Sequence, residues 1–337
     1  MITLREIVEK QKQDQSFHKV AICVTSYNQR QYIDEALQSL LEQKTDFPFV
    51  VIVGDDHSTD GSVELLNEYQ KKYPDIIKVL FSQENHGLFY NRRQIFLNCS
   101  APYVAFCDGD DYWIDENCLQ KKYDFLESHL NYIGYQTACY TKTGNEVSQS
   151  TDLQINNCFF DFDIKNARNN DYPGQVGGFF FRNIYRYMSK EDFEEYTNIP
   201  IDDSGKLPIV AGMMAPIYRQ DKTATFMYRF HNSSMERQKE KTNMCQKLFL
   251  SHLQYESMIE NLFNNEIKMN LHDQMMQLVV NAFVTALKSG VAGKTAKGDW
   301  KQFIYLYNYG YFEKREIRYS IRRFLMQKIR SKGMQNG

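Results

Sequence analysis

The 337-residue sequence predicts an α/β fold with a mostly parallel sheet, followed by a helical C-terminal region. Three observations carry this prediction. Short apolar runs alternate with helical patterns through residues 20–140, and polar or acidic loops follow three of the runs. From about residue 241, apolar side chains recur at helical spacing instead. We therefore divide the chain into an N-terminal helix at 1–18, an α/β domain at 19–240 and a helical region at 241–337.

The predicted strands are short runs rich in β-branched and aromatic residues, each about as long as a buried strand. They cover residues 20–24, 49–53, 77–81 and 103–107. The helices between them place apolar residues on one face. These residues are Ile33, Ala36, Leu37, Leu40 and Leu41 in the first helix, and Val63, Leu65, Leu66 and Tyr69 in the second, with a third helix near 89–97. Such crossovers are right-handed.

The second half of the chain has a weaker pattern. Segments 141–157 and 165–173 are rich in Asn and Asp and are predicted to be loops. Strands are expected at 178–181 and 225–230, on either side of a helix around 207–214. A turn-rich break at 289–298 divides the helical C-terminal region.

Composition limits the function classes. With 40 Lys and Arg against 42 Asp and Glu, no overall field marks the chain as a nucleic-acid binder. The seven cysteines form no C-x-x-C pair, which favours reduced thiols and a cytoplasmic location. The polar start is unlike a signal peptide. No apolar run reaches the roughly 18 residues of a membrane span, so membrane contact would be peripheral.

Polar side chains follow three of the predicted strands. Ligands in an open α/β sheet gather at the carboxyl ends of the strands. The segments there are Thr25-Ser26-Tyr27-Asn28, then residues 55–61, and Asp108-Gly109-Asp110-Asp111-Tyr112-Trp113. We expect them to converge on one edge of the sheet.

Crowded carboxylates at this edge indicate a hard cation, because Mg²⁺ or Mn²⁺ takes one or two carboxylates together with phosphate oxygens. A single Asp after a strand is more often a helix cap or an Asx-turn. Two acidic clusters at neighbouring strand ends favour a nucleotide diphosphate site instead. No glycine-rich phosphate loop follows the first strand.

These segments together resemble the family-2 inverting glycosyltransferases of GT-A fold, many of which build bacterial surface polysaccharides. The resemblance covers roughly residues 18–235 and is carried by segments 20–28, 53–62 and 106–113. It implies a Rossmann-like, mostly parallel sheet flanked by helices, with the helical C-terminal region as an extension. The predicted 19–240 domain would then be the nucleotide-sugar glycosyltransferase domain.

The resemblance also assigns roles to the strand-end residues. Thr25 and Tyr27 would line the nucleoside pocket, with Tyr27 against the base or, alternatively, as core filler. Asp56 would accept a hydrogen bond from uracil N3–H, which favours UDP, while Asp55 would be its neighbour or a loop brace. Asp110 is the expected metal ligand. Asp108 would reach the ribose or a metal-bound water, and Asp111 would brace the turn.

Later segments complete the implied site. Arg92 of Asn91-Arg92-Arg93 would hold the nucleotide, although it also fits a solvated helix face. Pro200-Ile201-Asp202-Asp203 resembles the segment of the catalytic base, with Asp203 the better match, Asp202 the second and a helix N-cap the alternative role. Tyr228-Arg229-Phe230-His231 resembles a segment closing the donor site, so Arg229 or His231 would contact the diphosphate, with a structural His231 as the alternative.

The expected function follows from this resemblance: metal-dependent, inverting transfer of a sugar from a UDP-sugar to an acceptor hydroxyl, with Mn²⁺ or Mg²⁺. It would be a hexosyltransferase or N-acetylhexosaminyltransferase acting on a glycan or lipid-linked acceptor. A non-catalytic nucleotide-sugar-binding or scaffold protein is the alternative. An aspartyl-phosphate phosphatase is disfavoured, because its nucleophile follows the first strand and the D-x-D here follows the fourth.

The C-terminal region contains a basic helical stretch interleaved with apolar residues. Its basic residues are Lys314, Arg315, Arg318, Arg322, Arg323, Lys328, Arg330 and Lys332. Such a stretch fits peripheral contact with anionic lipid at the inner face of the membrane, or a solvated helix face packed on the domain. The region is also compatible with a homo-oligomer.

Overall fold

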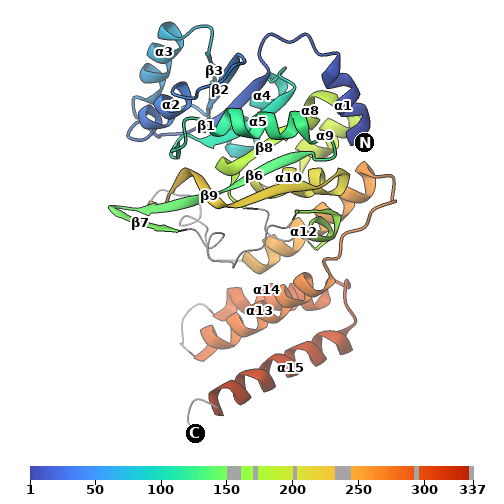
Figure 1. Ribbon diagram of the computed structural model, residues 1–337. Helices are drawn as coiled ribbons and strands as arrows, with labels where there is room; N and C mark the ends of the chain where they lie inside the picture. Colours follow the sequence, from blue (N-terminus) through green and yellow to red (C-terminus); the bar gives the residue numbers. More distant parts are fainter. Residues whose placement is uncertain (150–160, 170–173, 200–202, 232–243, 292–295, 334–337) are drawn as a thin grey trace. The chain divides into compact units, whose positions relative to one another are not determined.

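The computed structural model describes residues 1–149, 161–169, 174–199, 203–231, 244–291 and 296–333 (Figure 1). The chain divides into two compact units, Met1–Asn232 and Ser233–Gly337, which are taken in turn.

The first half of the large unit is a parallel sheet with crossover helices. Strands β1 (Val20–Ser26), β2 (Phe49–Asp55), β3 (Ile77–Phe81) and β4 (Tyr103–Asp108) lie in the order β3-β2-β1-β4. They alternate with helices α2 (Ile33–Leu41), α3 (Ser62–Lys72) and α4 (Leu88–Leu97). The four predicted strands and three predicted helices are confirmed. Parallel register places Thr25 beside both Gly54 and Asp108.

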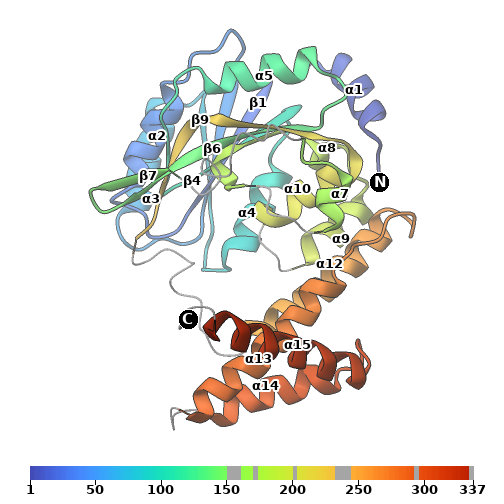
Figure 2. The same ribbon diagram turned by 60° about the horizontal axis from the view of Figure 1, so that its bottom comes forward.

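Burial explains why these segments fold as they do. All seven residues of β1 are buried, so its uninterrupted apolar run is covered on both faces. One face of the sheet packs against α2, α3 and α5 (Cys118–Ser128), and alternate residues of β4 face α4 on the other side. There the ring of Phe96 meets Phe106 edge-on, 6.2 Å between centroids. Figure 2 shows α5 and α4 on opposite sides of the sheet.

The second half of the unit extends the sheet with mixed pairing. β8 (Phe179–Arg182) runs antiparallel to β4 and to β6 (Gly134–Thr143), and β6 runs parallel to β9 (Ile217–Arg229). Two short strands, β5 (Tyr112–Trp113) and β7 (Glu146–Gln149), pair with β9 and β6. The described strands thus form one nine-stranded sheet. Because β5 pairs with β9, the end of β9 lies beside the acidic segment after β4.

Several expectations for this half were wrong or incomplete. The loop predicted at 141–157 begins with the β6–β7 hairpin, because cross-strand hydrogen bonds outweigh its polar composition; residues 150–160 lie outside the described chain. The loop predicted at 165–173 begins as helix α7 (Ile164–Arg168), because Asp163 and Asn166 form a reciprocal capping box. The strand predicted at 225–230 is the end of the longer β9.

The other expected elements are present with shifted ends. The strand at 178–181 is β8, preceded by a 3₁₀ turn, η1 (Val176–Gly178), and the helix around 207–214 is α10 (Asp203–Met214). At the start of the chain, a capping box formed by Thr3 and Glu6 caps the N-terminus of α1 (Leu4–Lys12). The sequence pattern did not reveal α5, α8 (Ile184–Tyr187) or α9 (Lys190–Asn198).

The small unit is helical. It contains α12 (Met244–Leu262), α13 (His272–Val291), α14 (Ala296–Asn308) and α15 (Lys314–Gly333), and α13 packs against the other three. Both described ends of the expected break at 289–298 are helical, since α13 continues to Val291 and α14 starts at Ala296; residues 292–295 lie outside the described chain. In the part of the chain described, no helix is long and apolar enough to span a bilayer.

Candidate functional site

Asp108, the last residue of β4, is the point where three elements meet. The hydroxyl of Thr25, at the end of β1, donates to Asp108 Oδ1 at 2.6 Å. The Arg92 guanidinium, buried on α4, donates to the same oxygen at 2.9 Å. The structure therefore brings together three residues that the sequence assigned to nucleotide binding. The Asp108 side chain keeps 28% of its surface exposed, so the edge remains open to a ligand.

A tight turn follows Asp108 and explains the glycine in the acidic segment. The Gly109 N–H donates to the Thr25 carbonyl at 2.9 Å, so the turn lies directly against the end of β1. A Cβ at Gly109 would lie 2.9 Å from that carbonyl oxygen and 2.3 Å from the Gln29 amide oxygen. Only glycine permits this close approach. The turn presents Asp110 at its tip.

Asp110 is held from the end of β9. His231 Nε2 lies 3.0 Å from Asp110 Oδ2, and the His231 ring stacks on Tyr32 with centroids 4.7 Å apart. The Asp110 side chain is 20% exposed and that of His231 is 17% exposed. Asp110 and His231, both predicted as site residues, are thus in direct contact at a solvent-accessible position.

Arg229 supports the acidic turn through its backbone and its side chain. Its guanidinium donates to the Asp110 carbonyl at 2.7 Å and pairs with Glu35 of α2. The rings of Tyr32 and Tyr112 lie 5.2 and 4.4 Å from it. The expected contact of Arg229 with a diphosphate stays a prediction. The contacts in the structure are those of a brace for the turn.

Asp111 is buried beneath the turn and accepts the Arg229 backbone N–H at 2.8 Å. Burial, and then the neighbouring charges of Asp110 and Asp108, raise the pKa of Asp111 well above its ordinary value. Its contacts match the expected role of bracing the turn. Three carboxylates thus lie close together at this turn.

The second acidic pair, at the end of β2, accepts hydrogen bonds from the loops after β2 and β3. Asp55 accepts the backbone N–H of Ser58 at 2.9 Å and its hydroxyl at 2.6 Å. Asp56 accepts the N–H groups of His86 at 2.9 Å and Gly87 at 2.7 Å. Both carboxylates are buried. These bonds hold two loops at the edge, and contact of Asp56 with a uracil stays a prediction.

The loops after β1 and β2 are also bound to each other. Asn28 has a left-handed backbone, φ 53°, which Asn tolerates better than most residues. Its side-chain oxygen accepts the Thr59 N–H at 2.8 Å, and its own N–H donates to the Ser58 hydroxyl at 2.9 Å. The preceding Tyr27 is left 49% exposed, so its ring is available to stack on a planar group.

A cavity of about 480 Å³ lies next to this edge, between β3 and α4. Asp55 forms part of its wall, and His86 and Tyr90 lie at it with their rings 4.2 Å apart. The rest of the lining is largely polar, with Ser82, Gln83, Asn91, Gln94 and Asn98 among it. This volume is large enough for part of a nucleotide.

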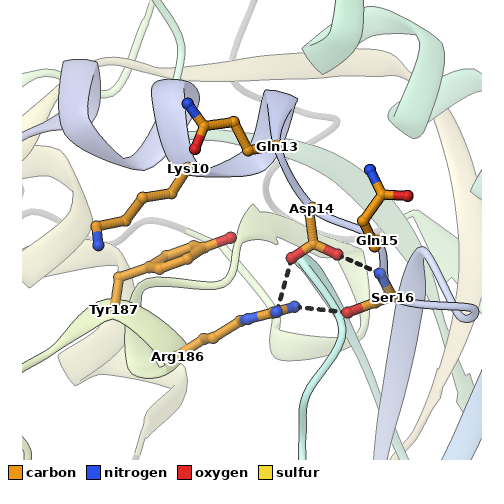
Figure 3. A pocket seen from close by; sticks show the side chains of 7 residues that line it. All are labelled: Lys10, Gln13, Asp14, Gln15, Ser16, Arg186 and Tyr187. Atoms are coloured by element: carbon orange, nitrogen blue, oxygen red, sulfur yellow. Dashed lines mark hydrogen bonds and ion pairs between the residues drawn. The ribbon is translucent and has the colours of Figure 1, made fainter.

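Another cavity, of about 520 Å³, lies away from the acidic edge, between the end of α1 and α8 (Figure 3). Its cation, Arg186, pairs with Asp14 at 2.7 Å and donates to the Ser16 hydroxyl at 3.1 Å. Figure 3 shows these groups turned toward one another. They attach the N-terminal segment to the domain.

The proposed base lies at the start of α10. Asp203 is the first residue of that helix, and only its backbone is described; Asp202 lies outside the described residues.

Three residues around Arg229 were not predicted from the sequence: Glu35, Tyr32 and Tyr112. Their only signal was position, because Tyr32 and Glu35 open the helix after the first strand and Tyr112 follows the acidic turn.

The fit of a divalent cation was tested on the described residues. None of them form a group of three or more His, Cys, Asp or Glu side chains arranged to hold a metal. Asp110 and Asp108 supply the one or two carboxylates that Mg²⁺ or Mn²⁺ uses when phosphate oxygens complete its shell. Both carboxylates are partly exposed, so a cation could reach them.

Comparison with solved structures identifies the class of this fold. Staphylococcus aureus TarS, solved in complex with UDP-GlcNAc, is similar with a TM-score of 0.55 and 18% identity, over 90% of this chain and 92% of that one. The predicted GT-A fold with a helical C-terminal region is confirmed.

The sequence profile of glycosyl transferase family 2 matches residues 21–188, which contain β1 to β4 and both acidic segments. The chain belongs to this family.

Relatives match about a third of the chain. An uncharacterized protein of Mycobacterium tuberculosis is 38% identical over 110 residues, 33% of this chain and 32% of that protein. The putative teichuronic acid biosynthesis glycosyltransferase TuaG of Bacillus subtilis is 34% identical over 125 residues, 37% of this chain and 46% of that protein. The chain thus spans between a third and a half of the length of these relatives.

Proposed function

We propose that this protein transfers a sugar from a nucleotide-sugar donor, a UDP-sugar, to an acceptor hydroxyl during synthesis of a surface polysaccharide. The convergence of Thr25, Arg92 and Asp108, with Asp110 at the tip of the next turn, carries the proposal. The family match and the similarity to relatives such as TuaG support the reaction class and the polysaccharide setting.

Donor binding follows from the position of each group. Tyr27 stacks on the base, and the neighbouring Asp56 accepts its N–H. Arg92 and Thr25 fix the Asp108 carboxylate toward the ribose. Asp110, with Asp108 beside it, would hold Mn²⁺ or Mg²⁺, which when bound neutralises negative charge on the diphosphate. His231, the present partner of Asp110, lies where it can donate to a phosphate oxygen.

Transfer also needs a base that removes the proton of the acceptor hydroxyl. We assign this role to Asp203, with Asp202 as the second choice. Attack from the face opposite the leaving diphosphate would invert the anomeric configuration in a single displacement. Enclosing donor and acceptor in one site supplies the alignment that this displacement requires.

A donor screen tests the proposal. The full chain is incubated with Mn²⁺ and a panel of UDP-, GDP- and dTDP-sugars, and nucleotide release is measured. We expect release from at least one UDP-sugar. Absence of release from every donor, with UDP still binding, would favour a non-catalytic nucleotide-sugar-binding protein.

The base assignment has its own test. Asp203→Asn should lower transfer about a hundredfold to ten-thousandfold while donor binding survives. Asp75→Asn, at an exposed position before β3, is the matched control and should keep full activity. Normal turnover by the Asp203 variant would remove this residue from the mechanism.

A further inference from the structure

The last helix of the small unit, α15, concentrates positive charge that the whole chain does not have. Residues 314–333 contain eight Lys or Arg and one acid, Glu316, whereas the complete sequence is balanced at 40 against 42. The excess is therefore local to one helix of about 30 Å.

One side of α15 is already covered by its own unit. Ile317 and Ile321, one turn apart, are 1% and 9% exposed, and the helix packs on α13 and α14. His272, the first residue of α13, lies 2.8 Å from Glu316 and packs edge-on against Phe312, with ring centroids 5.0 Å apart. The helix is thus held in place before it meets any partner, and its single acid is already engaged.

The opposite side is exposed and mixed in character. Arg315, Tyr319, Arg322 and Met326 follow the spacing i, i+4, i+7 and i+11, so they form one stripe. Tyr319 is 66% exposed and Met326 is 54% exposed. Arg318 and Leu325 lie beside this stripe and are exposed as well. We call these six residues the α15 face.

The cations of the α15 face are not neutralised within the protein. Across the described ranges, no ion pair involves Arg315, Arg318 or Arg322; Arg318 only donates to the Lys314 carbonyl of its own helix. Three guanidinium groups therefore remain available to external anions. Arginine suits phosphate groups because its planar fork donates two parallel hydrogen bonds.

We propose that the α15 face docks on the surface of an anionic phospholipid bilayer, with the helix lying in the plane of the interface. The arginines meet lipid phosphates, while Tyr319, Leu325 and Met326 enter the boundary between headgroups and acyl chains. Nucleic acid would satisfy the arginines but would leave exposed aliphatic side chains without a partner. For this reason the mixed face fits a lipid surface better.

Vesicle binding tests the proposal on the full chain. We expect co-sedimentation with vesicles that contain phosphatidylglycerol and not with vesicles of phosphatidylcholine alone. Binding should weaken as salt is added, because exposed charges are screened. Absence of binding to the anionic vesicles, or equal binding to both kinds, would overturn the proposal.

Two variants separate charge from fold. Arg315→Glu/Arg318→Glu/Arg322→Glu should lower vesicle affinity by at least about a hundredfold, since each interfacial cation contributes on the order of fivefold. Lys12→Glu/Lys71→Glu/Lys72→Glu makes the same change in net charge on exposed positions of the large unit and should bind normally. Circular dichroism checks that both variants keep their helices. Equal loss in both, or in neither, would contradict a role of the α15 face.

A third variant tests the apolar contribution. Tyr319→Ser/Met326→Ser keeps every charge, so we expect binding to anionic vesicles to weaken severalfold without being abolished. Unchanged vesicle binding, with tighter binding to an oligonucleotide than to vesicles, would reassign the face to nucleic acid.

The proposal is independent of the sugar-transfer proposal, and the same samples show this. The arginine triple variant should release UDP from a soluble donor at the normal rate. If the wild-type protein releases UDP but does not bind vesicles, only the membrane inference is refuted. If it binds vesicles but releases no UDP, only the proposed function is refuted.

Discussion

The two acidic pairs at the strand ends look alike in sequence but have different partners in the structure. Asp55 and Asp56, at the end of β2, are buried. Asp55 accepts hydrogen bonds from Ser58 in the loop after β2, and Asp56 accepts them from backbone N–H groups in the loop after β3. Asp108 and Asp110, after β4, are partly exposed and face Arg92 and His231. Loop donors fix the orientation of Asp55 and Asp56, whereas Asp108 and Asp110 keep part of their side-chain surface exposed to a ligand.

The largest expected effect separates the pairs by activity. Asp110→Asn should lower Mn²⁺-dependent UDP release on the order of a thousandfold, because a metal supplies several kcal/mol of charge stabilisation. Its stability should change little, since the amide still reaches His231. A variant with a normal rate and normal metal dependence would contradict the assignment of Asp110.

The next effect concerns the partner of Asp108. Arg92→Gln removes a hydrogen bond between charged groups, a bond that contributes about 1.5–3 kcal/mol. We expect a higher KM for the donor, measured by steady-state kinetics, from loss of the fixed Asp108 orientation. Arg93→Gln, one residue along the same helix, is the matched control and should leave the KM unchanged. Equal KM values in the two variants would remove Arg92 from donor binding.

A stability effect is expected at the other pair. Asp55→Ala leaves the Ser58 N–H and hydroxyl without their acceptor, which should cost about 1–3 kcal/mol in the free energy of unfolding. Urea denaturation measures it, with the exposed Asp75→Ala as control. If Asp55→Ala unfolds like wild type, the contrast between the two pairs fails.

The smallest expected effect is on the pH dependence of stability, and it compares two buried cations, Arg92 and Lys122. Arg92 has a carboxylate partner, whereas the buried Lys122 donates to the Gly178 carbonyl at 3.1 Å and lies over the Trp113 ring. Burial lowers the pKa of Lys122 below its ordinary value. Between the lowered pKa and about pH 10.4, the unfolded chain binds a proton that the folded chain does not. Stability should therefore rise with pH in that window.

Lys122→Met should lack this rise, so the wild-type advantage over the variant grows with pH. Urea denaturation at neutral pH and at about pH 9.5 measures the difference. Lys121→Met, at an exposed neighbouring position, should keep the wild-type dependence. Identical pH profiles for the two variants would show that burial does not perturb Lys122.

The first half of the large unit could be predicted from the sequence, whereas the second half could be predicted only in part. β1 to β4 were predicted because each parallel strand is buried on both faces and appears as an apolar run. β6 and β9 were missed or truncated, because their pairing joins residues far apart along the chain. Helix α7 was missed because its capping box is local chemistry without apolar periodicity.

The site shows the same division. Thr25, Asp108 and Asp110 were predictable, since residues after parallel strands must lie at one edge of the sheet. Glu35 was not, because its partner Arg229 is 194 positions away.

The sequence by itself determined the first four strands, the acidic edge and the family, because apolar periodicity and strand-end position are properties of short segments. Only the tertiary structure decided which carboxylates are bound by loops and which face cations at an open edge. It also decided that Arg315, Arg318 and Arg322 of α15 are exposed, on the side of the helix away from Ile317 and Ile321. These outcomes depend on distant partners and on burial, and both arise only when the chain is folded.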